Sequence, residues 1–246
     1  MDRHNGVYVS PRAQLGAGVR LGSGVKIYGP ARIGEGTWLD TGVVIGYPAA
    51  EEVAELRNAS GACRDLDEAF DAITSNSTTL GARSFVRTGS VIYSGVEIGD
   101  QLDCAHHVVV REGCWLGSSV ELGPFAYLKR DCRVGHYTRI ATELCDRTYV
   151  GQHCSIYGRT SHKFLSGISG LVEDAPAVRD GVVVGRDAIV IGGIEIGELA
   201  YVAAGAVVTQ TVGPETVVAG NPARFLRERK RDEAPDLWQR VRRREV

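Results

Sequence analysis

Aliphatic side chains recur at every sixth position along most of this chain. The rhythm occupies residues 9–45, 80–140 and 178–208, with Val150 and Ile156 between the last two runs. Of these 26 positions, 25 carry Val, Ile or Leu, and 12 are followed directly by Gly, as in LGAGVR and IGEGTW. A helix places apolar residues three and four apart and an amphipathic strand places them two apart, so a period of six fits neither. The pattern predicts a parallel β-helix, the architecture that hexapeptide repeats indicate.

A coil made of three successive hexapeptides explains this period. Three short strands joined by three tight turns close one triangular coil, and successive coils stack at the spacing of neighbouring strands, about 4.8 Å. The aliphatic residue of each hexapeptide then points into the prism, while small residues let the backbone bend at the corners. Contacts between neighbouring coils therefore stabilise the fold.

Composition and charge narrow the range of functions. With 246 residues, 43% of them hydrophobic, the chain has enough apolar surface for one large domain, which we expect over residues 1–223. The formal net charge of −2 argues against nucleic-acid binding, which needs a clustered excess of Lys and Arg. No apolar run has the length of a signal peptide or a membrane span, so we expect a cytoplasmic protein that binds no membrane.

The last stretch of the chain, residues 224–246, reads as one or two short helices broken at Pro235. Its apolar side chains are expected to pack on the prism or on a neighbouring subunit, while its arginines face solvent. These apolar residues are Phe225, Leu226, Leu237 and Trp238.

The six cysteines show no metal-ligand spacing. Cys114, Cys132 and Cys154 each lie four positions after an aliphatic residue of the repeat. The first two are three hexapeptides apart, and the third follows after the same interval if the stretch CDRTY bulges a corner by four positions. We therefore expect the three to stack inside one wall. A metal site or a nucleophile is the alternative to a buried small hydrophobe, which we favour because no His or carboxylate shares the slot.

The C-terminal repeats carry the most specific sequence. Residues 182–225, VVVGRDAIVIGGIEIGELAYVAAGAVVTQTVGPETVVAGNPARF, resemble the coenzyme A-binding end of the hexapeptide-repeat acyltransferase superfamily, including its closing AGNPAR. The resemblance covers most of residues 7–226. It implies an all-β, left-handed parallel β-helix, a homotrimer with active sites between subunits, and acetyl-CoA or another acyl-CoA as co-substrate without a metal.

The same resemblance implies the residues that bind coenzyme A, along a groove between adjacent subunits. Two alanines that lie three hexapeptides apart would stack on one edge, where small side chains let the pantetheine arm approach the main chain, although ordinary turn packing would also explain them. The arginine could pair with a phosphate. The motif positions are Ala188, Gly205, Ala206, Thr209 and Arg224.

The longest break in the C-terminal half spans residues 161–177. His162 falls where the next aliphatic residue is due, and a His there would be an unsatisfied polar group in a dry core, so we expect it to turn outward with the loop. Galactoside and xenobiotic acetyltransferases of the superfamily carry their catalytic His on a loop at the corresponding place, although RTSHKF is not their motif. Glu173 and Asp174 on this loop would hold an acceptor ammonium or serve only as solvated charges.

A second candidate for the catalytic base is His106. The stretch CAHHVVV resembles the A-H-x-x-x-[VI] pattern of lipid A pathway acyltransferases, and His106 occupies its position. Thr209 lies roughly 8 Å along the axis from His162 but roughly 22 Å from His106 at about 4.8 Å a coil. An extended pantetheine arm spans roughly 17 Å, which favours His162. Other histidines with weaker claims are His107, His136 and His153.

The other long break, residues 47–78, contains AAEEVAELRNA and RDLDEAFDAI, both with helix-forming composition. It predicts a helical flap over one prism face or, alternatively, a lid over the acceptor site of a neighbouring subunit.

The sequence as a whole favours a coenzyme A-dependent acyltransferase that transfers an acetyl or short acyl group to an amino group of a sugar, sugar nucleotide or related small metabolite. An O-acyltransferase and a non-catalytic scaffold are the alternatives. A γ-type carbonic anhydrase is disfavoured, because no two histidines form its H-x4-H pair.

Overall fold

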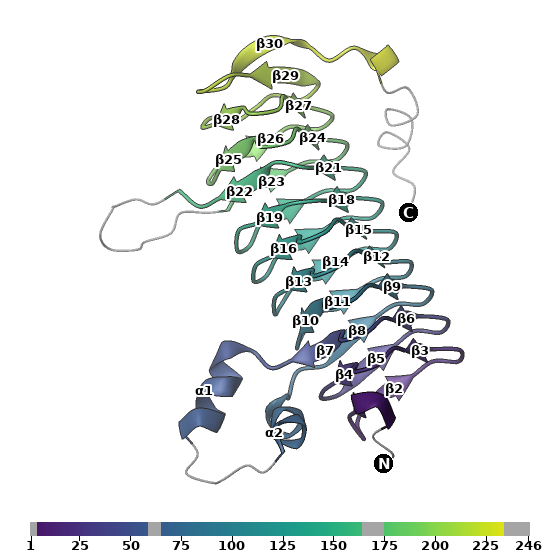
Figure 1. The fold of residues 1–246 in the computed structure, drawn as a ribbon. Helices are drawn as coiled ribbons and strands as arrows, with labels where there is room; N and C mark the ends of the chain where they lie inside the picture. The colour runs from purple at the N-terminus through teal and green to yellow at the C-terminus, as the bar shows by residue number, and fades with distance from the viewer. Residues whose placement is uncertain (1–3, 59–64, 164–174, 234–246) are drawn as a thin grey trace. The chain divides into compact units, whose positions relative to one another are not determined.

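The computed structural model describes residues 4–58, 65–163 and 175–233, and it divides into two compact units, residues 1–130 and 131–246 (Figure 1). In each unit, short strands follow one another around a coil, and most pair in parallel with the strand three further along the chain. This confirms the predicted all-β parallel solenoid.

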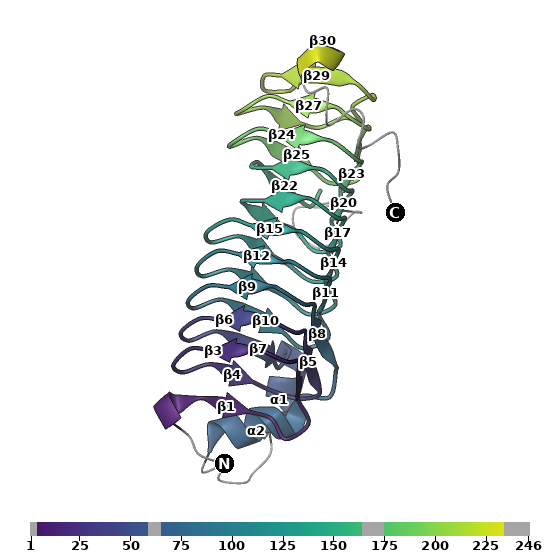
Figure 2. The ribbon, with the colours of Figure 1, turned by 90° about the vertical axis from the view of Figure 1, so that its right-hand side faces the viewer.

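The first unit has three sheets, each forming one face of the coils, whose stacking is visible from the side in Figure 2. Its first face contains β1 (Tyr8–Val9), β4 (Lys26–Ile27), β7 (Val44–Tyr47), β10 (Val91–Tyr93), β13 (Val109–Val110) and β16 (Tyr127–Leu128). The second contains β2 (Gln14–Leu15), β5 (Ala31–Ile33), β8 (Thr78–Leu80), β11 (Glu97–Ile98) and β14 (Trp115–Leu116). The third contains β3 (Arg20–Leu21), β6 (Trp38–Leu39), β9 (Phe85–Val86), β12 (Asp103–Cys104) and β15 (Glu121–Leu122). A short 3-10 turn, His4–Gly6, precedes β1.

The second unit repeats this arrangement. One face contains β19 (Glu143–Leu144), which contacts β22 (Arg159–Ser161), followed by β25 (Ile189–Ile191) and β28 (Val207–Val208). Another contains β17 (Arg133–Val134), β20 (Tyr149–Val150), β23 (Ala177–Val178) and β26 (Glu195–Ile196). The third contains β18 (Arg139–Ile140), β21 (Ser155–Ile156), β24 (Val183–Val184), β27 (Tyr201–Val202), β29 (Thr216–Ala219) and β30 (Arg224–Glu228), before a 3-10 turn at Arg231–Glu233.

The six-residue period marks the core of both units. Every predicted inward residue from Ile27 to Val208 is buried, with at most 3% of its surface exposed. At the N-terminal end, Leu15 is 40% exposed, and Val9 and Leu21 are half-buried. The first coil has a neighbour on one side only, so its inward residues have fewer contacts.

The corners accept larger side chains than the sequence suggests. Phe125 and Tyr137 adopt left-handed φ values of 61° and 56°, a region that costs most side chains free energy. The Phe125 ring stacks on His107 with centroids 5.6 Å apart, and the Tyr137 ring stacks on His153 at 5.0 Å. Contact with the ring of the neighbouring coil offsets part of the backbone strain.

The irregularity in the second unit is a shortening of two corners, not the four-residue bulge that the sequence predicts at CDRTY. Ile140 is followed by the next inward residue, Leu144, after four positions, and Ile156 is followed by Thr160 after four. The stretch CDRTY itself forms an ordinary corner, with Arg147 at φ 62°. Thr160, rather than His162, therefore occupies the inward slot, paired with Val190 of β25.

This shortening overturns the predicted cysteine column. Cys132 directly precedes β17, whereas Cys154 precedes β21 on a different face, because each shortened corner moves the later residues around the prism. Cys154 instead contacts Thr138, whose hydroxyl accepts a hydrogen bond from the Cys154 amide at 3.1 Å. Cys114, Cys132 and Cys154 are all buried, as expected for small hydrophobes.

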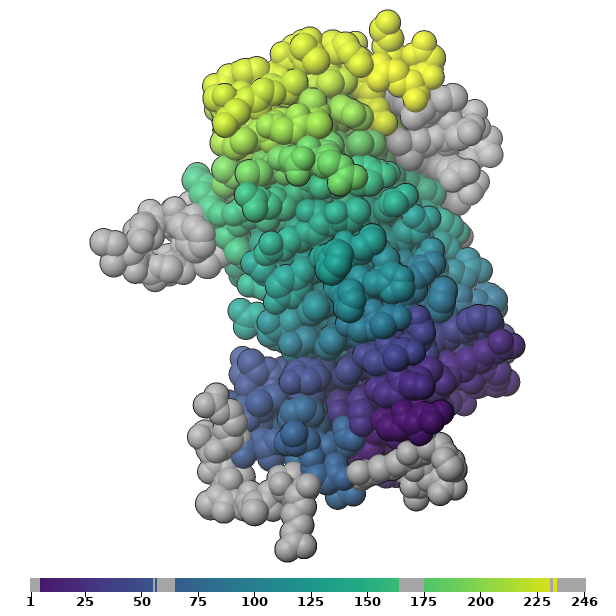
Figure 3. All heavy atoms as spheres, viewed as in Figure 1, coloured from purple at the N-terminus to yellow at the C-terminus, as the bar shows by residue number. Residues whose placement is uncertain are grey.

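The insertion at residues 47–78 contains two helices, α1 (Ala50–Asn58) and α2 (Leu66–Ile73). Its described part lies against the first face of its own unit (Figure 3), which agrees with the flap interpretation. The Asp67 carboxylate accepts a hydrogen bond from the Tyr28 hydroxyl at 2.8 Å, and Phe70 packs edge-on against Tyr28 and Tyr47. The Asp71 carboxylate accepts a 2.7 Å hydrogen bond from the Gly29 amide.

Removing Asp71 should loosen this flap. Its carboxylate is the acceptor for a buried amide and pairs with Arg12 at 3.4 Å, so Asp71→Ala should lower the free energy of opening the insertion by roughly 2 kcal/mol. Hydrogen exchange of the α2 amides measures this opening. Glu68→Ala, which changes an exposed carboxylate of the same helix, is the control, and equal acceleration in both variants would contradict the assignment.

The C-terminal segment differs from the predicted helical tail. Residues 224–228 form β30, which runs antiparallel to β29 and pairs Ala219 with Arg224 and Val218 with Phe225. Phe225 and Leu226 are 66% and 60% exposed, so they do not pack on the prism of their own chain, and their packing on a neighbouring subunit stays a prediction. A strand at this place satisfies the hydrogen-bonding groups on the open edge of β29, which a helix would leave exposed. Leu237 and Trp238 lie outside the described residues.

Among the helices of the described ranges, none is both long and apolar enough to cross a membrane.

Candidate functional site

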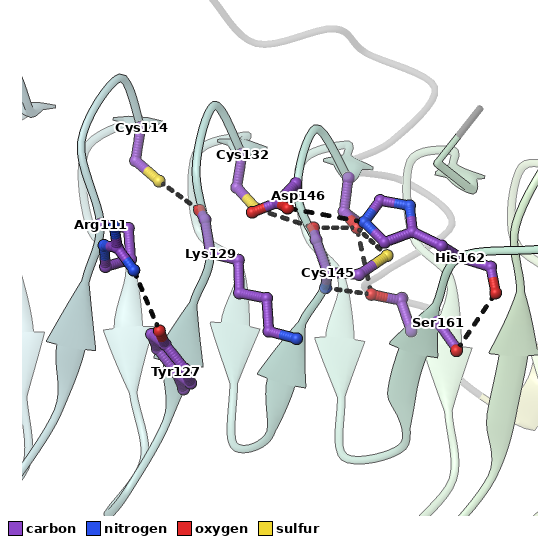
Figure 4. Close-up of polar contacts among 11 residues, drawn as sticks. Arg111, Cys114, Tyr127, Lys129, Cys132, Cys145, Asp146, Ser161 and His162 are labelled. Atoms are coloured by element: carbon purple, nitrogen blue, oxygen red, sulfur yellow. Dashed lines mark hydrogen bonds and ion pairs between the residues drawn. The ribbon is translucent and has the colours of Figure 1, made fainter. Parts of the chain in front are cut away.

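His162 lies directly after β22, where its side chain meets a carboxylate from the preceding coil. The His162 Nε2 atom is 3.8 Å from Asp146 Oδ2, and the two side chains are 12% and 30% exposed (Figure 4). That distance allows an ion pair when the imidazole is protonated, although it is longer than a hydrogen bond. A carboxylate beside this largely buried imidazole can orient the ring, as a general base requires.

Asp146 is a site residue that the sequence reasoning missed. The interval from Asp146 to His162 is two positions shorter than one full coil, because the corner at Tyr157 and Gly158 is short. Aligning the two residues from the sequence would have required the position of that short corner.

The strands expected to bind coenzyme A follow β22 directly on the same face. β25 pairs with β22 and β28 pairs with β25, so the strand before Thr209 lies two coils beyond the strand before His162, where the repeat count gave slightly less than two. The register of β25 and β28 also stacks Ala188 over Ala206 at the corner, with both methyl groups fully buried. Gly205, at φ 71°, and Thr209 are exposed beside them.

The short corner before His162 approaches this region closely. A Cβ atom on Gly158 would lie 2.6 Å from the carbonyl oxygens of both Ala188 and Gly185, nearer than van der Waals contact allows. Glycine is therefore required here by the close approach of two backbones.

Gly158→Ala should consequently force the corner at Gly185 and Ala188 to move, which costs roughly 1–3 kcal/mol of folding free energy. Thermal unfolding measures the loss. Gly213→Ala is the matched control, since a Cβ there meets only the Thr216 hydroxyl at 3.4 Å. Unfolding midpoints that fall equally in both variants would show that the close approach is not the cause.

Several predicted residues stand apart from this pair. Arg224 is exposed on β30, and its guanidinium donates a hydrogen bond to the Ala223 carbonyl. His106 belongs to the first unit and is exposed at a corner. Glu173 and Asp174 lie outside the described residues.

Three buried cysteines of the described chain are poorly suited to act as nucleophiles. Burial raises the pKa of the Cys104 and Cys154 thiols to about 12, and burial also raises the pKa of Cys145. A thiol in such surroundings stays protonated near neutral pH and reacts slowly. In the part of the chain that the structure describes, no three His, Cys, Asp or Glu side chains gather in a way that could hold a metal ion.

Comparison with known proteins finds acetyltransferases. No family model matches the chain. The chain is 43% identical over 107 residues to a serine acetyltransferase of Salmonella typhimurium, a match that covers 44% of this chain and 38% of the relative. It is 46% identical over 65 residues to a 2,3,4,5-tetrahydropyridine-2,6-dicarboxylate N-acetyltransferase of Alkaliphilus metalliredigens, covering 25% and 27%. This chain covers only 27% to 38% of the length of each of the first curated relatives.

Solved structures give partial matches of the same kind. A hexapeptide-repeat acetyltransferase from Vibrio cholerae, solved with acetyl coenzyme A, is 27% identical, with 48% of this chain and 72% of that chain covered and a TM-score of 0.44. A galactoside acetyltransferase in complex with coenzyme A is 18% identical, with 49% and 67% covered and a TM-score of 0.40. In its six-residue repeat, its parallel coils and its partial sequence matches to curated acetyltransferases, the chain is a hexapeptide-repeat β-solenoid that resembles the left-handed β-helix acyltransferase superfamily.

Proposed function

We propose that the chain transfers an acetyl or short acyl group from coenzyme A to a small-molecule acceptor, with His162 as general base. The observation that carries this proposal is the pairing of His162 with Asp146 directly beside the strands whose sequence resembles a coenzyme A-binding end. The partial matches to named acetyltransferases support it.

The chemistry follows from the residues of the site. Nε2 of His162 faces Asp146, and Nδ1 is buried in the described chain. In the proposed reaction the acceptor displaces the side chains that cover Nδ1, and Nδ1 takes its proton as the acceptor nitrogen or oxygen attacks the thioester carbonyl. The carbon–sulfur bond then breaks, and the imidazolium returns the proton to the leaving thiolate. Asp146 keeps the ring oriented and stabilises its charged form between these two steps. No residue of the chain needs to bond covalently to the acyl group.

We propose that Ala188, Gly205, Ala206, Thr209 and Arg224 hold the coenzyme, in a homotrimer with sites between subunits. Ala188 stacks over Ala206 and both are buried, so the accessible residues beside them are Gly205 and Thr209. The exposed guanidinium of Arg224 is available for a phosphate. Glu173 and Asp174 remain candidates for holding an acceptor ammonium.

Two acceptor classes are candidates. An amino group of a sugar, sugar nucleotide or related metabolite is the leading acceptor, and one relative is named an N-acetyltransferase. A hydroxyl acceptor is the second candidate, because the longer match of 107 residues is to a serine acetyltransferase.

The test is turnover of acetyl coenzyme A, followed as released thiol, with amino sugars, sugar nucleotides, small amines and serine as acceptors. An acceptor that stimulates thiol release supports the proposal and decides between nitrogen and oxygen. A protein that neither binds coenzyme A nor releases thiol with any acceptor would be a non-catalytic scaffold.

A further inference from the structure

We infer that a buried cluster of hydroxyls and thiols in the second unit holds Asp146 toward His162, and that Thr160 is its central positioning residue. The kinetic part of this inference rests on the proposed function. The structural part depends only on the contacts of the cluster.

Thr160 is the polar exception among the inward residues. It occupies a slot that elsewhere in the described coils holds an aliphatic side chain or Cys104, and it is 5% exposed. Valine has nearly the same shape and would fill the slot without burying an oxygen. A buried hydroxyl lowers stability unless it is hydrogen-bonded, so its partners indicate what it does.

The hydroxyl of Thr160 replaces a backbone carbonyl as a hydrogen-bond acceptor. In neighbouring coils the amide after an inward residue donates to the carbonyl of the next coil, as Gly135 does to Val150 and Ala141 to Ile156. The corresponding amide of Cys145 donates instead to Thr160 Oγ1, at 2.9 Å. The regular coil pattern does not require this bond.

Side chains also hold the carbonyl of Cys145 (Figure 4). Thr148 Oγ1 donates to this oxygen at 2.7 Å and lies 3.1 Å from Thr160 Oγ1, and Cys132 Sγ donates to it at 3.2 Å. Thr148, Cys145 and Cys132 are at most 2% exposed, so water does not compete for these bonds.

These bonds connect both members of the catalytic pair. Asp146 follows Cys145 directly, and His162 stands two positions after Thr160. A single hydroxyl thus links the peptide before the carboxylate to the strand before the imidazole. Positioning of this kind matters because a displacement of about 1 Å can cost about 100-fold in rate.

The test compares Thr160→Val with Thr160→Ser, which restores the hydroxyl. The first readout is the NMR titration of the His162 ring, identified by its absence in His162→Ala. In Thr160→Val its midpoint should move toward that of Asp146→Asn, because the carboxylate no longer faces the ring, whereas Thr160→Ser should keep the wild-type midpoint. Arg159 and Lys163 flank His162 and are unchanged in every variant.

The second readout is kinetic. Thr160→Val should lower kcat by about tenfold to 100-fold while the KM for acyl-coenzyme A stays unchanged, and Thr160→Ser should recover most of the rate. Thr138→Val is the matched control, since this buried hydroxyl also accepts from an amide, that of Cys154, but lies on another face. It should leave the His162 titration unchanged.

Each outcome decides one proposal. A folded Thr160→Val protein with the wild-type His162 titration overturns the positioning role. If wild type transfers no acyl group, the proposed function fails, while the titration still tests the cluster. If Thr160→Val does not fold, Thr148→Val removes the other hydroxyl and is read in the same way.

Discussion

Replacing His162 by alanine should lower kcat by about 10²- to 10⁴-fold, the usual contribution of a general base. The affinity for coenzyme A, measured by direct binding, should stay within about twofold, since the expected coenzyme positions lie on β25, β28 and β30 or beside them rather than on β22. The loss would place proton transfer at the side chain that faces Asp146 at 3.8 Å.

Two matched variants make this result decisive. His136→Ala removes an exposed imidazole from the same unit and should leave turnover unchanged. His106→Ala tests the rival base of the first unit. Full activity in His162→Ala together with loss in His106→Ala would move the catalytic site to the first unit and contradict the proposal.

Replacing Arg229 by alanine should lower the free energy of unfolding of the C-terminal coils by about 3 kcal/mol. Arg229 is 6% exposed, and its Nη1 atom donates to the carbonyls of Leu199 at 2.8 Å and Gly181 at 3.2 Å. Burial lowers the pKa of this guanidinium. The truncation leaves buried carbonyls without their charged donor and opens a cavity between β30 and the coils it covers.

Urea unfolding and hydrogen exchange of the β29 amides measure this change. Arg227→Ala is the control, because its exposed ion pair with Glu233 should contribute little. If the two variants are equally stable, Arg229 does not fasten the C-terminal segment. Coenzyme A binding should weaken in Arg229→Ala alone, since Arg224 lies on the strand that Arg229 anchors.

The candidate site was only partly readable from the sequence. His162 could be selected because a long break in the repeat falls beside a coenzyme A-like end, and that reasoning did not require the exact register. Asp146 could not be selected, because its alignment with His162 depends on the corner between Ile156 and Thr160, which is two positions short. A constant six-residue period placed the inward slot at His162, two positions after Thr160, which occupies it. Another short corner led the same period to assign Cys154 to the wrong face.

The sequence by itself determined the solenoid, because the pattern within each hexapeptide indicates which residue points inward, and this pattern repeats in every coil. Only the tertiary structure decided where corners shorten, which polar groups meet inside the second unit, and that residues 224–228 form a strand. Those features depend on contacts between coils, such as Thr160 with Cys145, whose partners are distant in sequence and leave no periodic signal. The repeat fixes the direction of a side chain, and the stacking of coils fixes its neighbour.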